Sequence, residues 1–99
     1  MKKAYLITYD YKGSAENYEG LFNELKAFQK WWHYINNSWI VITSHDSNSI
    51  YRKLKPHLDE KINLLVIEVG KDRSGWLPIK AWDWINENLD SLSNLRPTY

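Results

Sequence analysis

The sequence contains no cysteine, which excludes disulfide bonds and thiolate metal sites. It also has almost no charge imbalance, because thirteen Lys and Arg residues face twelve Asp and Glu residues and leave a net charge of +1. A dedicated phosphate binder usually carries a clear basic excess. Composition therefore does not demand a nucleic-acid partner.

Several motifs of known chemistry are absent as well. There is no glycine-rich phosphate loop, no His-x-x-x-His or Cys-x-x-Cys spacing, and no nucleophile elbow. The histidines are scattered, at His33, His45 and His57, so a standard metalloenzyme is not expected. The apolar run near the N-terminus soon meets Asp10 and is too short for a signal peptide or a membrane span. We therefore expect a cytoplasmic protein of one domain, with no membrane partner.

Aromatic residues are abundant. They make up 15% of the chain, with six Trp and seven Tyr against two Phe. Trp and Tyr are amphipathic, so their excess over Phe favours half-buried surfaces, interfaces or ligand platforms. The alternative is a small domain that fills its core with large rings.

Residue patterns predict an alternating series of strands and helices. Runs rich in β-branched and aromatic residues predict strands at 3–11, 31–35, 38–43 and 61–69. Apolar residues at helical spacing predict helices at 17–29, from a cap at Asp46 or Ser47 to about Lys55, and at 79–92. Pro56 lacks an amide hydrogen and should end or kink the second helix.

The order β-α-β-β-α-β predicts an α+β, ferredoxin-like antiparallel sheet with two helices on one face. The core of this domain spans about 3–70, and residues 71–99 add a C-terminal helix and a frayed tail. A sheet covered on one face should alternate apolar and polar residues. Instead, Ile40–Ile42 and Leu64–Ile67 are apolar at every position. Either the C-terminal helix or a partner chain must cover the second face, and we expect a homodimer to which the C-terminal segment contributes.

The segment from Trp31 to Thr43 combines aromatic residues with a hairpin pattern. Asn36-Asn37 predicts a two-residue turn, because asparagine tolerates the positive φ that such a turn needs. Adjacent Trp31 and Trp32 face opposite ways in a strand, so one of them can present its ring to a ligand or pack on a partner. The candidate ligand-binding residues of this segment are Trp31, Trp32, His33, Tyr34 and Trp39.

Asp10 closes the first predicted strand. A carboxylate at a strand end can ligate Mg²⁺, and two such residues across a dimer axis can share one ion. Asp10 is therefore the candidate catalytic and metal-binding residue, and Mg²⁺ is the cofactor if the protein is a nuclease. The alternative is a loop-starting aspartate that bonds to nearby backbone amides.

Two groups of basic residues are further ligand candidates. Arg52 and Lys53 belong to a small basic patch around the second helix, which is either a phosphate contact or a solvated face. Lys71 and Arg73 lie in a glycine-flanked loop that can close on an anion. Trp76, just after this loop, completes the candidate set.

Four stretches of the chain resemble small bacterial and phage proteins of the SinR family, which are similar in turn to the CRISPR-associated small endoribonucleases. The stretches are Tyr5–Tyr11, Trp31–Val41, Pro56–Glu60 followed by Leu64–Ile67, and Gly75–Pro78 with Ala81-Trp82. The resemblance implies a ferredoxin-like fold and a homodimer. It also implies that Asp10 matches the aspartate those nucleases use for metal-dependent phosphodiester cleavage. Their arginine-bearing second strand is replaced here by Trp31-Trp32-His33-Tyr34.

Three functions are compatible with these patterns. The first is a dimeric, non-catalytic module that binds a nucleotide or a short nucleic acid, for instance to sequester a nucleotide signal in phage–host defence or counter-defence. The second is a Mg²⁺-dependent nuclease that uses Asp10. The third is a protein–protein interaction domain whose tryptophans fill an oligomer interface.

Overall fold

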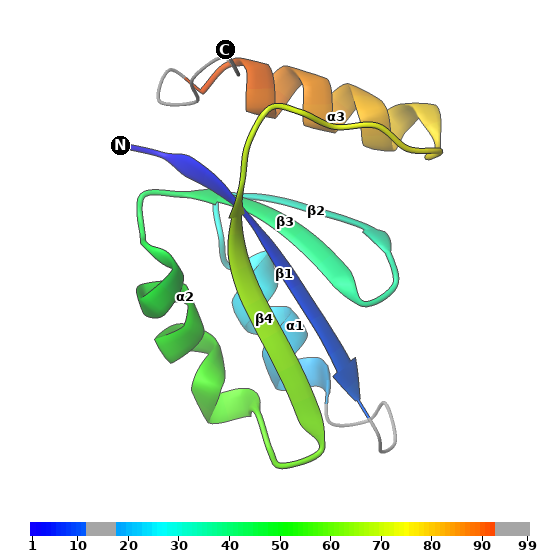
Figure 1. Cartoon of the computed structure of the whole chain (residues 1–99). Helices are drawn as coiled ribbons and strands as arrows, with labels where there is room; N and C mark the ends of the chain where they lie inside the picture. The colour runs from blue at the N-terminus through cyan, green and yellow to red at the C-terminus, as the bar shows by residue number, and fades with distance from the viewer. Residues whose placement is uncertain (12–17, 93–99) are drawn as a thin grey trace.

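The computed structural model describes residues 1–11 and 18–92, with the side chain of residue 11 left aside. Its elements are β1 (Lys3–Tyr11), α1 (Tyr18–Lys26), β2 (Lys30–Ile35), β3 (Ser38–Thr43), α2 (Ser47–Leu54), the 3₁₀ helix η2 (Lys55–His57), β4 (Ile62–Val69) and α3 (Ile79–Asp90). The predicted α+β class is confirmed: one four-stranded antiparallel sheet packs with three α-helices (Figure 1). The predicted start of the first helix at residue 17 and the tail predicted after the C-terminal helix lie outside the described residues.

The strands of the sheet lie in the order β2-β3-β1-β4. The central strands β3 and β1 pair with each other, while β2 and β4 form the two edges. The crossover through α1 therefore carries the chain from β1 past the position of β3 to the far edge. Since neighbouring strands alternate in direction, the start of β1, the start of β2 and the end of β3 lie at the same end of the sheet (Figure 1).

Helices α1 and α2 cover one face of the sheet, which we call the helix-covered face. Every second residue of β1, namely Tyr5, Ile7 and Tyr9, points into this core. Its other buried members come from the helices and the remaining strands: Leu21, Leu25, Phe28, Trp39, Val41, Ile50, Leu54 and Ile62. This cluster is the larger of two separate hydrophobic cores.

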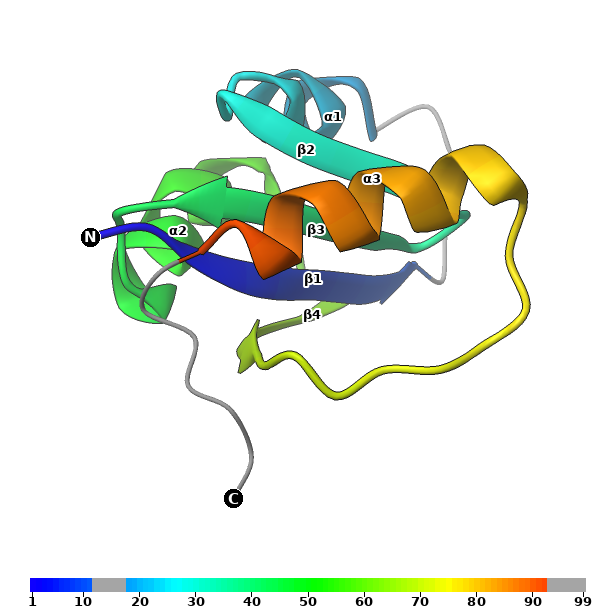
Figure 2. The ribbon, with the colours of Figure 1, turned by 90° about the horizontal axis from the view of Figure 1, so that it is seen from above.

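Helix α3 packs on the opposite side of the sheet, which we call the second face (Figures 1 and 2). Its buried residues Ala81, Ile85 and Leu89 recur at helical spacing and meet residues of β1, β2 and β3. The strand residues of this second core are Ala4, Trp32 and Ile42. Of the two alternatives for covering this face, the structure contains the C-terminal helix, which packs over Ala4, Trp32 and Ile42 and leaves Leu65 and Ile67 of β4 about half exposed.

The predicted hairpin is confirmed, but its turn differs from expectation. No described residue has a positive φ, so Asn36-Asn37 does not adopt the left-handed conformation predicted for it. Trp32 pairs with Ile40 and Ile35 pairs with Ser38, which leaves β2 one residue longer than β3 between these pairs. Such a bulge increases the local twist. The strands can therefore be joined without the left-handed residues of a primed turn.

Two helices end earlier than their apolar spacing predicts. The helix predicted to residue 29 ends at Lys26, and the one predicted to residue 92 ends at Asp90. Phe28 and Leu92 are nevertheless buried, because the turns that follow the helices fold them into the cores. Apolar spacing cannot distinguish a last helical turn from a buried residue of the following turn.

The predicted boundaries of α2 are confirmed. The Asp46 carboxylate accepts a hydrogen bond of 2.8 Å from the Ser49 backbone N–H, which caps the helix. This bond holds the pKa of Asp46 below its usual value. The α-helix ends at Leu54, and Pro56 lies in the following 3₁₀ helix. None of the helices in the described ranges is long and apolar enough to cross a membrane.

Candidate functional site

Trp32 is buried between the sheet and α3. Only 2% of its surface is exposed, and its indole N–H donates to the Ala81 carbonyl oxygen at 3.1 Å. Its ring belongs to the second core. Trp32 therefore serves to hold α3 on the sheet, and its polar edge is already satisfied.

Trp39 is buried on the helix-covered face. The His33 ring stacks on it at 3.9 Å with an interplanar angle of 11°, and its indole N–H donates to the Tyr9 hydroxyl at 3.1 Å. Burial raises the pKa of Tyr9, and the opposing effect of the Trp39 hydrogen bond is smaller. His33 is further held by a 2.9 Å contact between its Nε2 and the Asn36 carbonyl oxygen. His33 and Trp39 therefore form a stacked pair that the Tyr9 hydroxyl joins through a hydrogen bond.

Trp31 and Tyr34 are the accessible rings of the hairpin. Trp31 packs against Trp39 with ring centroids 5.3 Å apart and remains 38% exposed. Tyr34 is 47% exposed and lies beside Trp32. The five candidates of the hairpin thus separate into two groups on opposite faces of the sheet, so they do not form one ligand site.

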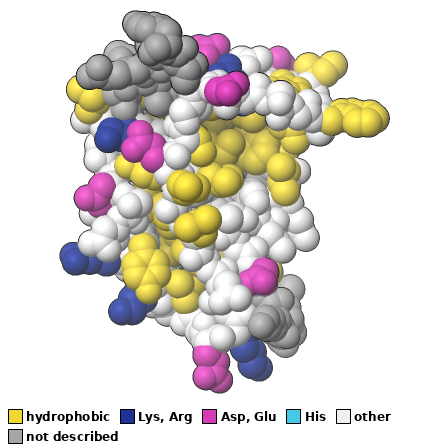
Figure 3. Space-filling view, viewed as in Figure 1, with side chains coloured by type: hydrophobic (Ala, Val, Ile, Leu, Met, Phe, Trp, Pro, Cys, Tyr) yellow, Lys and Arg dark blue, Asp and Glu magenta, His cyan; other side chains and the backbone are white. Residues whose placement is uncertain are grey.

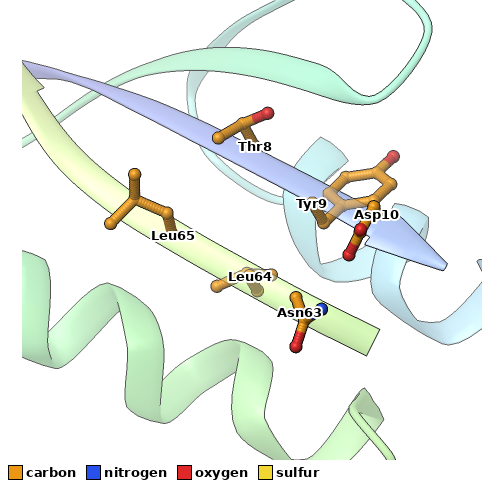
Figure 4. Close-up of a pocket in the computed structure, with 6 residues that line it drawn as sticks. All are labelled: Thr8, Tyr9, Asp10, Asn63, Leu64 and Leu65. Carbon is orange, nitrogen blue, oxygen red and sulfur yellow. The ribbon is translucent and has the colours of Figure 1, made fainter. Parts of the chain in front are cut away.

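Asp10 lies at the end of β1, opposite Asn63 at the start of β4. Together with Thr8 and Leu65 they line an open hollow of about 350 Å³ (Figure 4). Asp10 is exposed and is the only carboxylate among the described residues that line the hollow. Within the described ranges, no group of three or more His, Cys, Asp and Glu side chains is arranged to hold a metal ion.

The basic candidates occupy different surroundings. Arg73 is braced against α3, because its guanidinium donates to the Asn86 side chain at 2.8 Å and to Asp90 at 3.0 Å. It also donates to the Lys71 carbonyl oxygen at 2.8 Å, which ties the loop to the helix. Arg52 and Lys53 are exposed on α2. Helix α2 packs on the helix-covered face and α3 on the second face, so the two basic groups lie on opposite sides of the sheet and do not converge.

Trp76 is the most exposed large hydrophobic side chain in the described ranges, at 99%. It lies in the segment between β4 and α3, close in sequence to Ile79, which is 79% exposed. No ring contact of Trp76 with a described residue was found. Trp76 and Trp31 are therefore the tryptophans most available to a ligand or a partner.

Part of the second face is left open beside α3. Leu6 of β1 pairs with Ile67 of β4, and Thr8 pairs with Leu65, so these side chains share one face. Leu65 is 53% exposed and Ile67 is 49% exposed. We call Leu6, Leu65 and Ile67 the open apolar strip; Figure 3 shows apolar surface below α3 in this region. These residues were not among the predicted site residues. The sequence signal that could have found them is the run Leu64–Ile67, which is apolar at every position and so places apolar side chains on both faces of the sheet.

Comparisons with known proteins assign no family. No family model matches the chain, and neither the curated proteins nor the solved structures contain a significant match.

Proposed function

We propose that the protein is a homodimeric, non-catalytic binding module with a ferredoxin-like fold, and that its ligand is a nucleotide or a short nucleic-acid segment. The fold assignment is supported by the succession β-α-β-β-α-β before α3 and by a sheet in which β1 lies between β3 and β4. Sequestration of a nucleotide signal would require no more than such a module.

The open apolar strip carries the dimer proposal. Leu65 and Ile67 expose about half of their surface on a sheet face that α3 covers elsewhere. Exposed apolar patches of this kind mark interaction sites. A second copy suits the strip because a two-fold axis brings the same patch of both copies together, so apolar surface meets apolar surface. The α3 helices would then flank the interface on both sides.

Sedimentation of Leu65→Lys tests the dimer. We expect the wild type to be a dimer at micromolar concentration and the variant to dissociate at least about tenfold more readily, since a buried unpaired ammonium costs well over 1.4 kcal/mol. Leu65 is half exposed in the monomer, so the monomer should tolerate the change.

The matched control is Asn48→Lys, which adds the same charge on exposed α2 at the other face. A wild type that sediments as a monomer would overturn the dimer. Equal dissociation of the two variants would remove the strip from the interface.

Trp31 carries the ligand proposal. Trp31 is 38% exposed, and its ring packs against the buried Trp39 ring. Stacking of one base on an aromatic ring contributes about 1–3 kcal/mol. The net charge of +1 favours a small nucleotide over a long nucleic acid, because long polyanions are bound chiefly through many phosphate contacts.

Tryptophan fluorescence titrated with nucleotides, cyclic nucleotides and short oligonucleotides tests this ligand. We expect saturable quenching that Trp31→Ala weakens at least fivefold, with Trp76→Ala as the control for the other exposed ring. Absence of quenching by every probe would contradict the ligand proposal. If the same samples cleaved RNA or DNA with Mg²⁺, and Asp10→Ala abolished the cleavage, the nuclease alternative would replace non-catalytic binding.

A further inference from the structure

A second hollow lies at the end of the sheet where β1 and β2 begin and β3 ends. Its volume is about 220 Å³, and four segments that are far apart in the sequence line it. The polar lining consists of Lys2 before β1, Gln29 before β2, Thr43 at the end of β3, Ser44 and His45 after β3, and Lys53 on α2. Phe28 and Ile42 contribute apolar surface to it. This hollow is separate from the one that holds Asp10, which lies where β1 ends.

The charges around this hollow are of one sign. Two lysines and a histidine line it, and none of the described residues that line it is a carboxylate. Neither Lys2 nor Lys53 forms an ion pair with any carboxylate in the described part of the chain. Asp46 directly follows the lining residue His45, and its carboxylate accepts from the Ser49 N–H at the helix cap, so this one negative charge beside the hollow stands against the two lysines that line it. The hollow therefore has a surplus of positive charge in a protein that is nearly neutral overall.

The uncharged groups of the hollow suit an anion as well. The Ser44 hydroxyl and the Gln29 amide both supply hydrogen-bond donors beside the lysines. The Lys2 ammonium lies 3.3 Å from the Gln29 side-chain oxygen, so these two segments are already held together. An ammonium has three donors, so Lys2 keeps donors for a ligand.

We propose that this hollow binds a phosphate group of the nucleotide ligand, an inference that rests on the nucleotide binding proposed above. A volume of about 220 Å³ is below the roughly 300–1,000 Å³ of a pocket that encloses a whole small molecule, so it fits one end of the ligand. Trp31 follows Gln29 by two residues, which is roughly 7 Å of extended chain. A base on the Trp31 ring and a phosphate in the hollow are therefore compatible with one mononucleotide.

Nitrogen-15 NMR of the full chain tests the phosphate site. Inorganic phosphate, AMP and adenosine are titrated at constant ionic strength while the Ser44, His45 and Lys53 amide signals are followed. We expect saturable shifts with phosphate and AMP but not with adenosine. Lys2→Gln and Lys53→Gln should each weaken phosphate binding at least fivefold. Lys80→Gln, which removes an exposed lysine from α3, should leave it unchanged.

The outcomes separate this site from the proposed function. The phosphate site would be overturned if phosphate did not shift these amide signals, or if the shifts did not saturate. It would also be overturned if Lys53→Gln and Lys80→Gln changed phosphate binding equally. If AMP and adenosine quenched Trp31 equally without shifting these amides, nucleotide binding would stand and the hollow would be excluded. Saturable phosphate shifts without any nucleotide quenching would support the hollow as an anion site while the proposed nucleotide function fails.

Discussion

Trp39→Ala is expected to lower the free energy of unfolding by about 3–5 kcal/mol, the usual cost of removing a large buried side chain. Trp39 has no exposed surface and contacts residues from β1, α1 and β2. Its removal leaves a cavity between the sheet and α1, and it leaves the Tyr9 hydroxyl without its donor. Urea denaturation followed by circular dichroism measures the effect.

Trp76→Ala is the matched control for Trp39→Ala. It makes the same chemical change at a side chain that is 99% exposed. Exposed substitutions away from structural contacts usually change stability by no more than about 0.5 kcal/mol. If the two variants were equally stable, the placement of Trp39 in the core would be wrong.

Trp32→Ala is expected to loosen α3 from the sheet as well as to destabilise the protein, again by about 3–5 kcal/mol. Trp32 packs in the second core and bonds to the Ala81 carbonyl oxygen in the first turn of α3. The helix-covered face does not depend on this contact, because its core is a separate cluster. Amide hydrogen exchange should therefore accelerate in α3 far more than in α1.

Trp32→Phe separates the hydrogen bond from the packing. It keeps an aromatic ring but removes the N–H that donates to Ala81, so we expect a loss of about 1 kcal/mol beyond the change in ring size. If Trp32→Ala left the exchange rates of the α3 amides unchanged, Trp32 would not be what attaches this helix.

Local sequence patterns were sufficient for most of the fold. The β-branched and aromatic residues of β1, the cap at Asp46 and the proline at Pro56 each act through neighbouring backbone, so their effect can be read without knowing the rest of the molecule. The ends of α1 and α3 could not be read in this way. Phe28 and Leu92 continue the apolar spacing but are buried by turns, and the direction of a turn depends on what it packs against.

The composition of the candidate sites depended on tertiary structure more strongly than the fold did. The sequence identified the hairpin aromatics as important, and strand geometry required Trp31 and Trp32 to face opposite ways. It did not identify Lys2 or Ser44 as neighbours of Lys53, because 51 and 9 residues of chain separate them. Such convergence follows from strand pairing over long sequence distances, which no local pattern encodes.

The sequence by itself determined the order of the strands and helices, and it predicted apolar side chains on both faces of the sheet. The apolar residues at both parities of β3 and β4 indicate this. Only the tertiary structure decided which part of the second face α3 covers and which part it leaves exposed. Helix α3 is a single helix of twelve residues, and it packs beside Trp32 rather than Leu65 because the Ala81 carbonyl and the Trp32 indole fix it there. One helix cannot cover four strands, and the part that it leaves open is the surface where we expect a second copy to bind.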